Sequence, residues 1–180
     1  MRHLLIFICL LSAGFQAQAK TLSSTIEHNQ ESYTLCSDFT IKYGFIFKVA
    51  HVGLYLPDCS STLNPLEQPK KILRFKYLVD ISSEDFQSSA EEFYLKNVNT
   101  DVLEASKDEF YRFNAGYQDI ESGEFYDLIH QGDSKLSLYK NNASICATEN
   151  SVLAKNYFTI WFGQKPVLKK MKKALTQIKT

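Results

Sequence analysis

The fold is decided by residues 45–57, Phe-Ile-Phe-Lys-Val-Ala-His-Val-Gly-Leu-Tyr-Leu-Pro. This run of 13 residues is longer than the usual strand of about 5–6 residues, so it indicates a large sheet. One side of the predicted strand carries large or semi-polar residues, and the other is aliphatic apart from Lys48. This pattern predicts a central strand with both faces covered. Burying a lysine there is costly unless its amine reaches water or a partner, which makes Lys48 the first candidate for function.

The rest of the chain divides into early and late strands with a block of helices between them. Further strands are expected at residues 32–36, 72–79, 135–140 and 143–147, the last two around a turn at Asn141-Asn142, with a loose lead-in or edge strand at 20–31. Helices are expected from Ser82, from about Thr100, at 123–130, from Ser151 to about Gly163, and from Pro166, with Ser82 and Ser151 as the caps of their helices. Ser37-Asp38 is interpreted as the start of the turn into the long strand. This order predicts an α+β fold with an antiparallel sheet.

Three pieces of the sequence together resemble the chalcone isomerase-like family, and most closely its bacterial exported branch. They are Phe-Lys-Val and Leu-Tyr-Leu-Pro (47–49 and 54–57), Gly132-Asp133 before a strand, and Ile-Trp-Phe-Gly (160–163) with the nearby Pro166. The resemblance runs over roughly residues 30–176. It implies an open-faced β-sandwich, in which a layer of helices packs on a large antiparallel sheet and a ligand cleft lies between them.

The positions used by the catalytic members of this family are largely replaced. Plant members cyclise chalcones with a cation that holds the phenolate and with donors that hydrogen-bond the ketone as it becomes negative. The resemblance places their strand threonine at Ala50, their helix tyrosine at about Phe86, their helix asparagine at about Phe93, their C-terminal threonine at Ile160 (Thr159 is adjacent) and their arginine at Lys42. We therefore assign no catalytic residue and expect a protein that is not a chalcone isomerase.

The resemblance also implies that the cleft keeps the ability to bind a lipophilic ligand. Non-catalytic relatives bind fatty acids, using an arginine and a tyrosine for the carboxylate. Here Phe86 and Phe93 would make the helical wall of such a cleft more apolar, and Ala50 and Val52 would form its floor. A lipophilic or fatty-acid-like ligand is the expected partner.

The charged end of such a ligand needs a cation. Lys42 and Lys48 share one strand face by parity, so either can meet an anionic head group. Tyr43 and Tyr55 lie on the opposite parity and are weaker candidates. The complete set of ligand-binding candidates is Lys42, Lys48, Ala50, Val52, Phe86, Phe93, Thr159 and Ile160.

Two other classes of function stay open beside a carrier or sensor of a lipophilic acid. An enzyme of unrelated chemistry would use residues such as Asp85, Glu91 or Arg112, although the sequence offers no convergent acid–base pair. A partner-binding scaffold is the other alternative. Its contacts would be the lysine-rich tail or an aromatic helix surface of Tyr94, Tyr111 and Tyr126. An internal apolar cavity would favour the binding protein, and carboxylates of raised pKa inside it would favour the enzyme.

Residues 1–19 are interpreted as an export signal. A short polar start precedes an apolar core at 4–11, and Ala17-Gln18-Ala19 has the small-x-small pattern of a cleavage site. The apolar stretch is too short for a bilayer, which needs about 20 residues. We expect residues 20–180 to form one domain that is periplasmic or secreted.

The charge pattern gives no indication of nucleic-acid binding, because 20 basic residues balance 20 acidic ones. The balance is uneven along the chain, since the last acidic residue is Glu149 and seven lysines follow it. A solvated helix face is the favoured interpretation of these lysines. Weak attraction to an anionic membrane surface or an acidic partner is the alternative.

Three cysteines follow the export signal: Cys36, Cys59 and Cys146. With the hairpin placed at residues 37–44, Cys36 would lie near Phe45 and about 45 Å of extended chain from Cys59, too far for a disulfide. We therefore expect Cys59 and Cys146 to pair, with no disulfide as the alternative. The cysteine spacing fits no zinc pattern and the histidines are scattered, so neither a metal nor a cofactor is expected.

Overall fold

The computed structural model describes residues 22–44, 46–59, 64–132 and 134–177. The predicted export signal, Phe45 and Asp133 lie outside these ranges. The strands are β1 (Thr25–His28), β2 (Glu31–Tyr43), β3 (Phe47–Leu56), β4 (Lys70–Tyr77), β5 (Phe125–Gln131), β6 (Lys135–Lys140) and β7 (Ala143–Thr148). The helices are α1 (Ser83–Leu95), α2 (Thr100–Asn114), α3 (Ser151–Asn156), α4 (Thr159–Phe162) and α5 (Lys169–Leu175).

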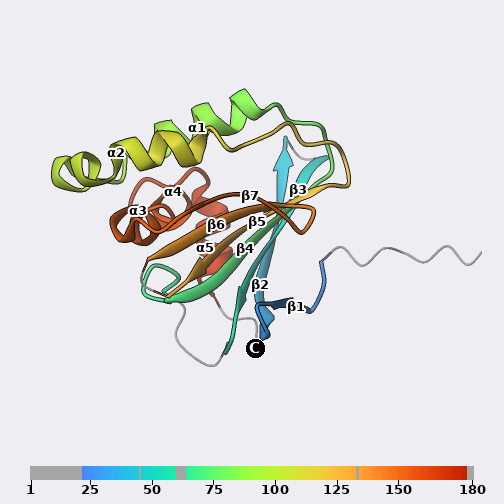
Figure 1. The fold of residues 1–180 in the computed structure, drawn as a ribbon. Helices are drawn as coiled ribbons and strands as arrows, with labels where there is room; N and C mark the ends of the chain where they lie inside the picture. The colour runs from blue at the N-terminus through green and yellow to red at the C-terminus, as the bar shows by residue number, and fades with distance from the viewer. Residues whose placement is uncertain (1–21, 45, 60–63, 133, 178–180) are drawn as a thin grey trace, which may run out of the picture.

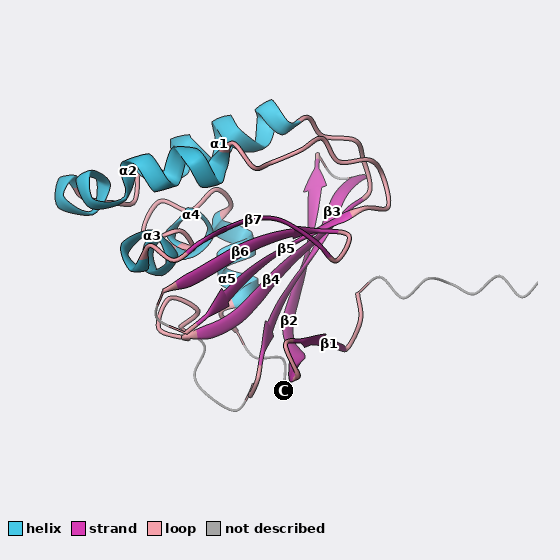
Figure 2. Cartoon of the chain, viewed as in Figure 1, coloured by secondary structure: helices cyan, strands magenta, loops and turns pink. Residues whose placement is uncertain are grey.

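The strands pair in sequence order from β1 to β7, each antiparallel to the next, in one sheet. The sheet is curled and the helices lie against one side of it (Figure 1). Figure 2 shows the separation of strands and helices into these two layers. The predicted α+β class, a large antiparallel sheet with a layer of helices, is confirmed.

Local signals account for the elements that the sequence located well. The Ser82 side chain accepts a hydrogen bond from the backbone N–H of Asp85 and caps α1, as expected. Asn141 and Asn142 both have positive φ (49° and 69°), which suits the tight turn between β6 and β7. None of the helices in the described ranges is long and apolar enough to cross a membrane.

Strand β2 is much longer than predicted, and the expected turn at Ser37-Asp38 is wrong. Both residues lie inside the strand, where Ser37 pairs with Leu54 and Asp38 with Gly53. The buried Ser37 hydroxyl donates to the carbonyl of Leu175 in α5 (2.8 Å), so a tertiary contact satisfies this polar side chain. The chain turns later, at Gly44, whose φ of 62° suits glycine.

The predicted cysteine pairing is wrong for the same reason. Cys36 and Cys59 form a disulfide, with an S–S distance of 2.00 Å and a Cα–Cα distance of 5.3 Å. Because β2 extends to Tyr43, Cys36 lies near the end of β3 rather than its start, and the adjacent Leu35 pairs with Tyr55. Cys146 is a free, half-buried thiol, and burial raises its pKa to about 12.

Three further predictions of local structure are corrected. Residues 123–130 were expected to be helical, but Phe125–Gln131 form β5, a central strand whose two buried faces leave no clear alternation in sequence. Asn150, not Ser151, caps α3. Helix α5 begins at Lys169 rather than Pro166, because the N–H of Val167 donates back to the carbonyl of Ile160 (2.9 Å).

A bulge in β3 changes which side chains face the helices. Ile41 pairs with Ala50 and Lys42 with Lys48, so Val49 is an extra residue without a partner in β2. Successive pairs alternate in face, so the two lysines share a face, as predicted, but it is opposite to that of Ala50. Lys48 is the second residue of β3 and is exposed, rather than buried in the middle of the strand as expected.

The sheet has an apolar cluster on each face. The larger one lies under the helices and contains the inward residues of β2 to β6. The smaller one, on the other face, consists of Tyr33, Tyr55, Ile72 and Ile129. Both faces of β3 are therefore covered near its C-terminal end, as predicted, whereas Ile46 and Phe47 at its start are exposed.

Candidate functional site

An apolar cavity of about 170 Å³ lies between the sheet and the helices. Its sheet side is formed by residues of β2 to β6, and its helix side by α1, α4, α5 and the segment before α5. Val49, the bulge residue, lines it beside Ile41, because the bulge turns the Val49 side chain toward the face of Ala50, the partner of Ile41. Among the described residues, no charged side chain lines this cavity.

The cavity wall is largely aromatic, and Phe86 of α1 is at its centre. The Phe86 ring meets Tyr77 and Tyr126 edge-on, both at 5.3 Å between centroids. It stacks on Tyr117 at 5.5 Å. These contacts hold each ring from at least one side. Trp161, the single tryptophan of the chain, lines the same cavity and contacts Phe75 at 5.5 Å.

Three tyrosine hydroxyl groups contribute polar atoms to this otherwise apolar wall. The Tyr126 hydroxyl donates to the carbonyl of Gln118 (2.5 Å), and that of Tyr117 accepts from Tyr157 (3.2 Å). The Tyr77 hydroxyl has no hydrogen-bond partner within the described ranges. Burial raises the pKa of Tyr77 and Tyr117, and that of Tyr126 to about 12. All three are therefore protonated at neutral pH, and Tyr77 is available to donate to a ligand.

A wider groove of about 760 Å³ adjoins the cavity. Ile41 and Leu168 line both spaces, so they form the boundary between them. The groove lies between β2 and the start of α5, and Lys42, Lys169 and Lys170 line it. All three lysines are exposed, and no acidic residue of the described chain lines the groove. The cavity is therefore apolar, and the groove that adjoins it is cationic.

The structure places four predicted site residues at or beside the cavity. Phe86 and Ile160 line it directly. Ala50 and Val52 are buried in the same core, where they pair with the lining residues Tyr77 and Phe75 of β4.

The other four predicted site residues are divided between different surroundings. Lys42 and Lys48 both lie on the sheet face opposite to that of Ala50, but Lys42 also lines the groove beside α5, whereas Lys48 does not. Phe93 packs at the edge of the core, with the Lys96 ammonium 4.6 Å from its ring centroid. Thr159 lines a separate groove and donates to the carbonyl of Asn156 (2.6 Å).

The sequence reasoning missed the tyrosines of the cavity. Alternation along the predicted strand 72–79 places Phe75 and Tyr77 on one face, but Tyr77 was not named as a site residue. Tyr126 was assigned to a helix surface, which is wrong, because it lies in β5 and is 2% exposed. Tyr94 is also buried in α1, so only Tyr111, 41% exposed, remains of the proposed aromatic contact surface.

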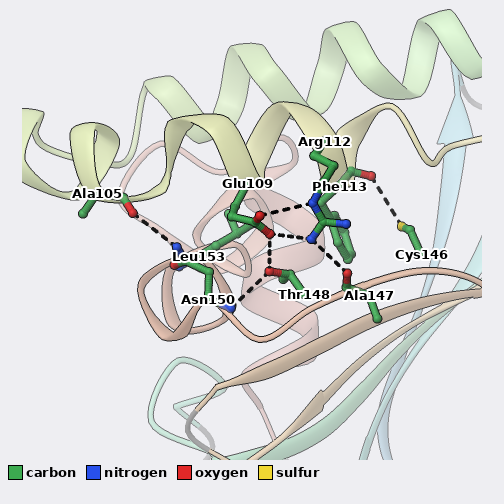
Figure 3. A network of polar contacts seen from close by, with 9 residues as sticks. All are labelled: Ala105, Glu109, Arg112, Phe113, Cys146, Ala147, Thr148, Asn150 and Leu153. Carbon is green, nitrogen blue, oxygen red and sulfur yellow. Dashed lines mark hydrogen bonds and ion pairs between the residues drawn. The ribbon is translucent and has the colours of Figure 1, made fainter.

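The residues considered for unrelated enzyme chemistry have structural partners instead. Arg112 pairs with Glu109 and donates to the carbonyl of Ala147 (3.2 Å), and Glu109 accepts from Thr148 (2.7 Å). Figure 3 shows this network, which joins α2 to β7 and to the start of α3. Asp85 belongs to the cap of α1 and Glu91 accepts from Tyr111 (2.8 Å). None of these carboxylates lines the apolar cavity.

A buried lysine forms a polar cluster outside the cavity. Lys71 is 1% exposed, donates to the carbonyl of Gln68 (2.5 Å) and lies over the Phe158 ring at 4.6 Å. Its nitrogen is 3.3 Å from Nδ1 of His130. Burial lowers the pKa of Lys71 to about 7. The cluster fastens the segment before β4 to the sheet. In the described ranges, no group of three His, Cys, Asp or Glu side chains is arranged to hold a metal ion.

The fold and the cavity define a class: an open-faced antiparallel sheet that encloses an apolar space under a helical layer. The sequence profile of the chalcone isomerase-like family matches residues 16–176, and the chain belongs to this family. Among solved structures it is similar to a fatty-acid binding protein of Arabidopsis thaliana, with a TM-score of 0.63 and 14% sequence identity over 86% of this chain and 90% of that chain. A search of curated proteins found no match.

We expect the protein not to accelerate the cyclisation of naringenin chalcone. Ala50 and Phe86 bring no polar side-chain atom to the core, and the lysines lie outside the cavity. Loss of one donor for the developing oxyanion typically costs about 10²–10³ in rate. The measurement is the decay of chalcone absorbance against spontaneous cyclisation in the same buffer, and turnover clearly above that background would contradict the expectation.

Proposed function

We propose that this protein is an exported, non-catalytic binding protein for a small lipophilic acid of the fatty-acid type. The observation that carries the proposal is the apolar cavity that adjoins a groove lined by three lysines. A ligand with an apolar tail and one anionic group matches both spaces at once. The similarity of the fold to a fatty-acid binding protein supports this choice of ligand class.

The volumes of the cavity and the groove indicate which part of the ligand each would hold. A cavity of about 150 Å³ holds benzene, so 170 Å³ takes roughly six to eight carbon atoms. The remainder of a longer chain and its carboxylate would lie in the groove, near Lys42, Lys169 and Lys170. Burial of about 0.8 kcal/mol per methylene makes the tail the main source of affinity. Exposed lysines contribute less, about 0.2–1 kcal/mol each.

Export is supported by the sequence pattern of residues 1–19 and by the Cys36–Cys59 disulfide. Disulfides form and persist mainly in oxidising compartments. We therefore propose a periplasmic or secreted location and membership of the exported branch of the family.

Binding can be measured through Trp161, because this single tryptophan lines the cavity. Titration with saturated fatty acids of increasing length is expected to change its fluorescence, with affinity rising until the cavity is filled. Ala90→Phe inserts a ring into the cavity lining and should weaken binding at least about tenfold. Ala105→Phe, on the exposed side of α2, is the matched control and should bind normally.

The lysine-lined groove is tested separately. Lys42→Met should weaken binding about two- to fivefold, as expected for an exposed ion pair. Lys48→Met removes the same charge from the neighbouring strand but outside the groove, and should leave affinity unchanged. The proposal fails if the protein binds no fatty acid at micromolar concentration, or if Ala90→Phe binds as well as the wild type.

A further inference from the structure

The most exposed apolar side chains of the described chain gather at one point, the tip of the β2–β3 hairpin. Tyr43, Ile46 and Phe47 are 78%, 81% and 71% exposed. The other large apolar residues on the described surface are exposed by 41% at most. We define Tyr43, Ile46 and Phe47 as the hairpin tip. Such a concentration of exposed apolar side chains on a small protein indicates a contact surface.

The hairpin tip projects beyond the rest of the sheet. Pairing between β3 and β4 begins at Ala50, and the carbonyl of Val49 still accepts from the N–H of Leu78 (2.8 Å), so only Phe47 and Lys48 of β3 pair with β2 alone. Figure 1 shows this two-stranded end extending past β4 to β7. The bulge at Val49 fixes the direction of the projecting ribbon, since bulges bend and twist the strand that carries them.

Positive charge flanks the hairpin tip. Lys42 and Lys48 are directly opposite each other across the ribbon, and both are exposed. Like charges in this arrangement repel, and an anionic surface would relieve that repulsion. Lys169 and Lys170 add charge across the adjoining groove. Residues 39–49 and 150–180 contain no Asp or Glu, and Asp38 lies four residues before Lys42 on the same face of β2.

We propose that the hairpin tip inserts into the interfacial region of an anionic lipid bilayer. Tyr43 and Phe47 are suited to the headgroup level, where aromatic residues concentrate, and Ile46 would lie among the acyl chains. The flanking lysines can extend along the surface to the anionic headgroups. A three-residue tip is far smaller than the roughly 800 Å² that a stable protein interface buries on each partner, which favours lipid over a protein partner.

This orientation would turn the lysine-lined groove toward the membrane, a consequence that rests on the proposed function. A lipophilic acid could then pass from the bilayer to the groove without crossing water. Membrane binding itself does not depend on that function, because the hairpin tip residues do not line the cavity or the groove.

The test is sedimentation of the full protein with vesicles that contain no free fatty acid. We expect binding to equimolar phosphatidylcholine and phosphatidylglycerol, weaker binding to phosphatidylcholine alone, and loss of binding as salt increases. Ile46→Ser with Phe47→Ser should reduce partitioning at least about tenfold. Lys48→Gln should reduce it about fivefold, because each basic residue near an anionic surface contributes by about that factor.

Matched variants and separate readouts make the outcome decisive. Leu95→Ser and Tyr111→Ser alter exposed apolar residues on helices and should not change vesicle binding. The hairpin tip variants should keep the Trp161 response to fatty acids, so failure of the ligand proposal and failure of this one are distinguishable. Absence of vesicle binding, or binding that the hairpin tip variants leave intact, would overturn the proposal. Self-association that these variants abolish, without vesicle binding, would instead identify a contact between two copies of the chain.

Discussion

Replacement of Cys36 and Cys59 by alanine is expected to lower the free energy of unfolding by roughly 3 kcal/mol. The disulfide spans 23 residues of sequence, and it joins the first half of β2 to the segment that follows β3. Removing it raises the conformational entropy of the unfolded chain, because the loop between the two cysteines is no longer closed. In a protein of this size, the melting temperature should fall by about 10 °C.

Thermal unfolding with and without reductant measures this effect. Cys146→Ala is the control, because Cys146 is a free thiol that donates a weak hydrogen bond to the carbonyl of Phe113 (3.4 Å) and closes no loop of the chain. Its loss should change the melting temperature far less. Peptide mapping of the non-reduced protein should recover a Cys36–Cys59 fragment. A Cys59–Cys146 fragment, or a melting temperature insensitive to reductant, would contradict the disulfide described above.

Arg74→Met is expected to destabilise the protein by about 3–5 kcal/mol. Arg74 donates to both carboxylate oxygens of Asp127 at 2.6 Å, on the face of the sheet opposite the helices. The Asp127 side chain is only 4% exposed, and Arg74 also lies 4.2 Å from the Phe125 ring centroid. The substitution leaves a buried carboxylate without its cation, and the cost is that of an uncompensated buried charge.

Urea denaturation at neutral pH provides the measurement. Arg74→Met with Asp127→Leu removes both charges together, so it should recover most of the loss. Arg112→Met breaks an exposed pair with Glu109 and should cost much less than Arg74→Met. If Arg74→Met and Arg112→Met were equally mild, the buried pair would not contribute as the geometry implies.

Local patterns were sufficient wherever neighbouring residues decide the conformation. The cap at Ser82 and the Asn141-Asn142 turn depend on contacts within a few residues, and both were predicted correctly. Alternation along residues 72–79 located β4 for the same reason. Hydrophobic positions such as Phe86 and Ile160 were placed near a cleft through the family resemblance, and they line the cavity.

Predictions failed where a distant contact overrides a local preference. Ser37-Asp38 has the composition of a turn, but the hydroxyl of Ser37 reaches α5 and the strand continues. Residues 125–131 are buried on both faces, so their sequence shows no period that separates strand from helix. The error in β2 then moved Cys36 to the wrong end of the hairpin and produced the wrong disulfide.

The candidate site shows the same division between local pattern and tertiary structure. The order of strands and helices in the sequence was enough to predict the antiparallel α+β fold, because residue type and alternation carry that information. The family resemblance, rather than any local pattern, implied that the catalytic polar groups are replaced. Only the tertiary structure decided that Val49 faces the cavity while Lys48 faces away, since a bulge depends on the register between two strands. Likewise, Tyr77, Tyr117 and Tyr126 meet only because β4, β5 and the segment after α2 pack around Phe86. Such side-chain convergence follows from packing between distant segments, which no local pattern records.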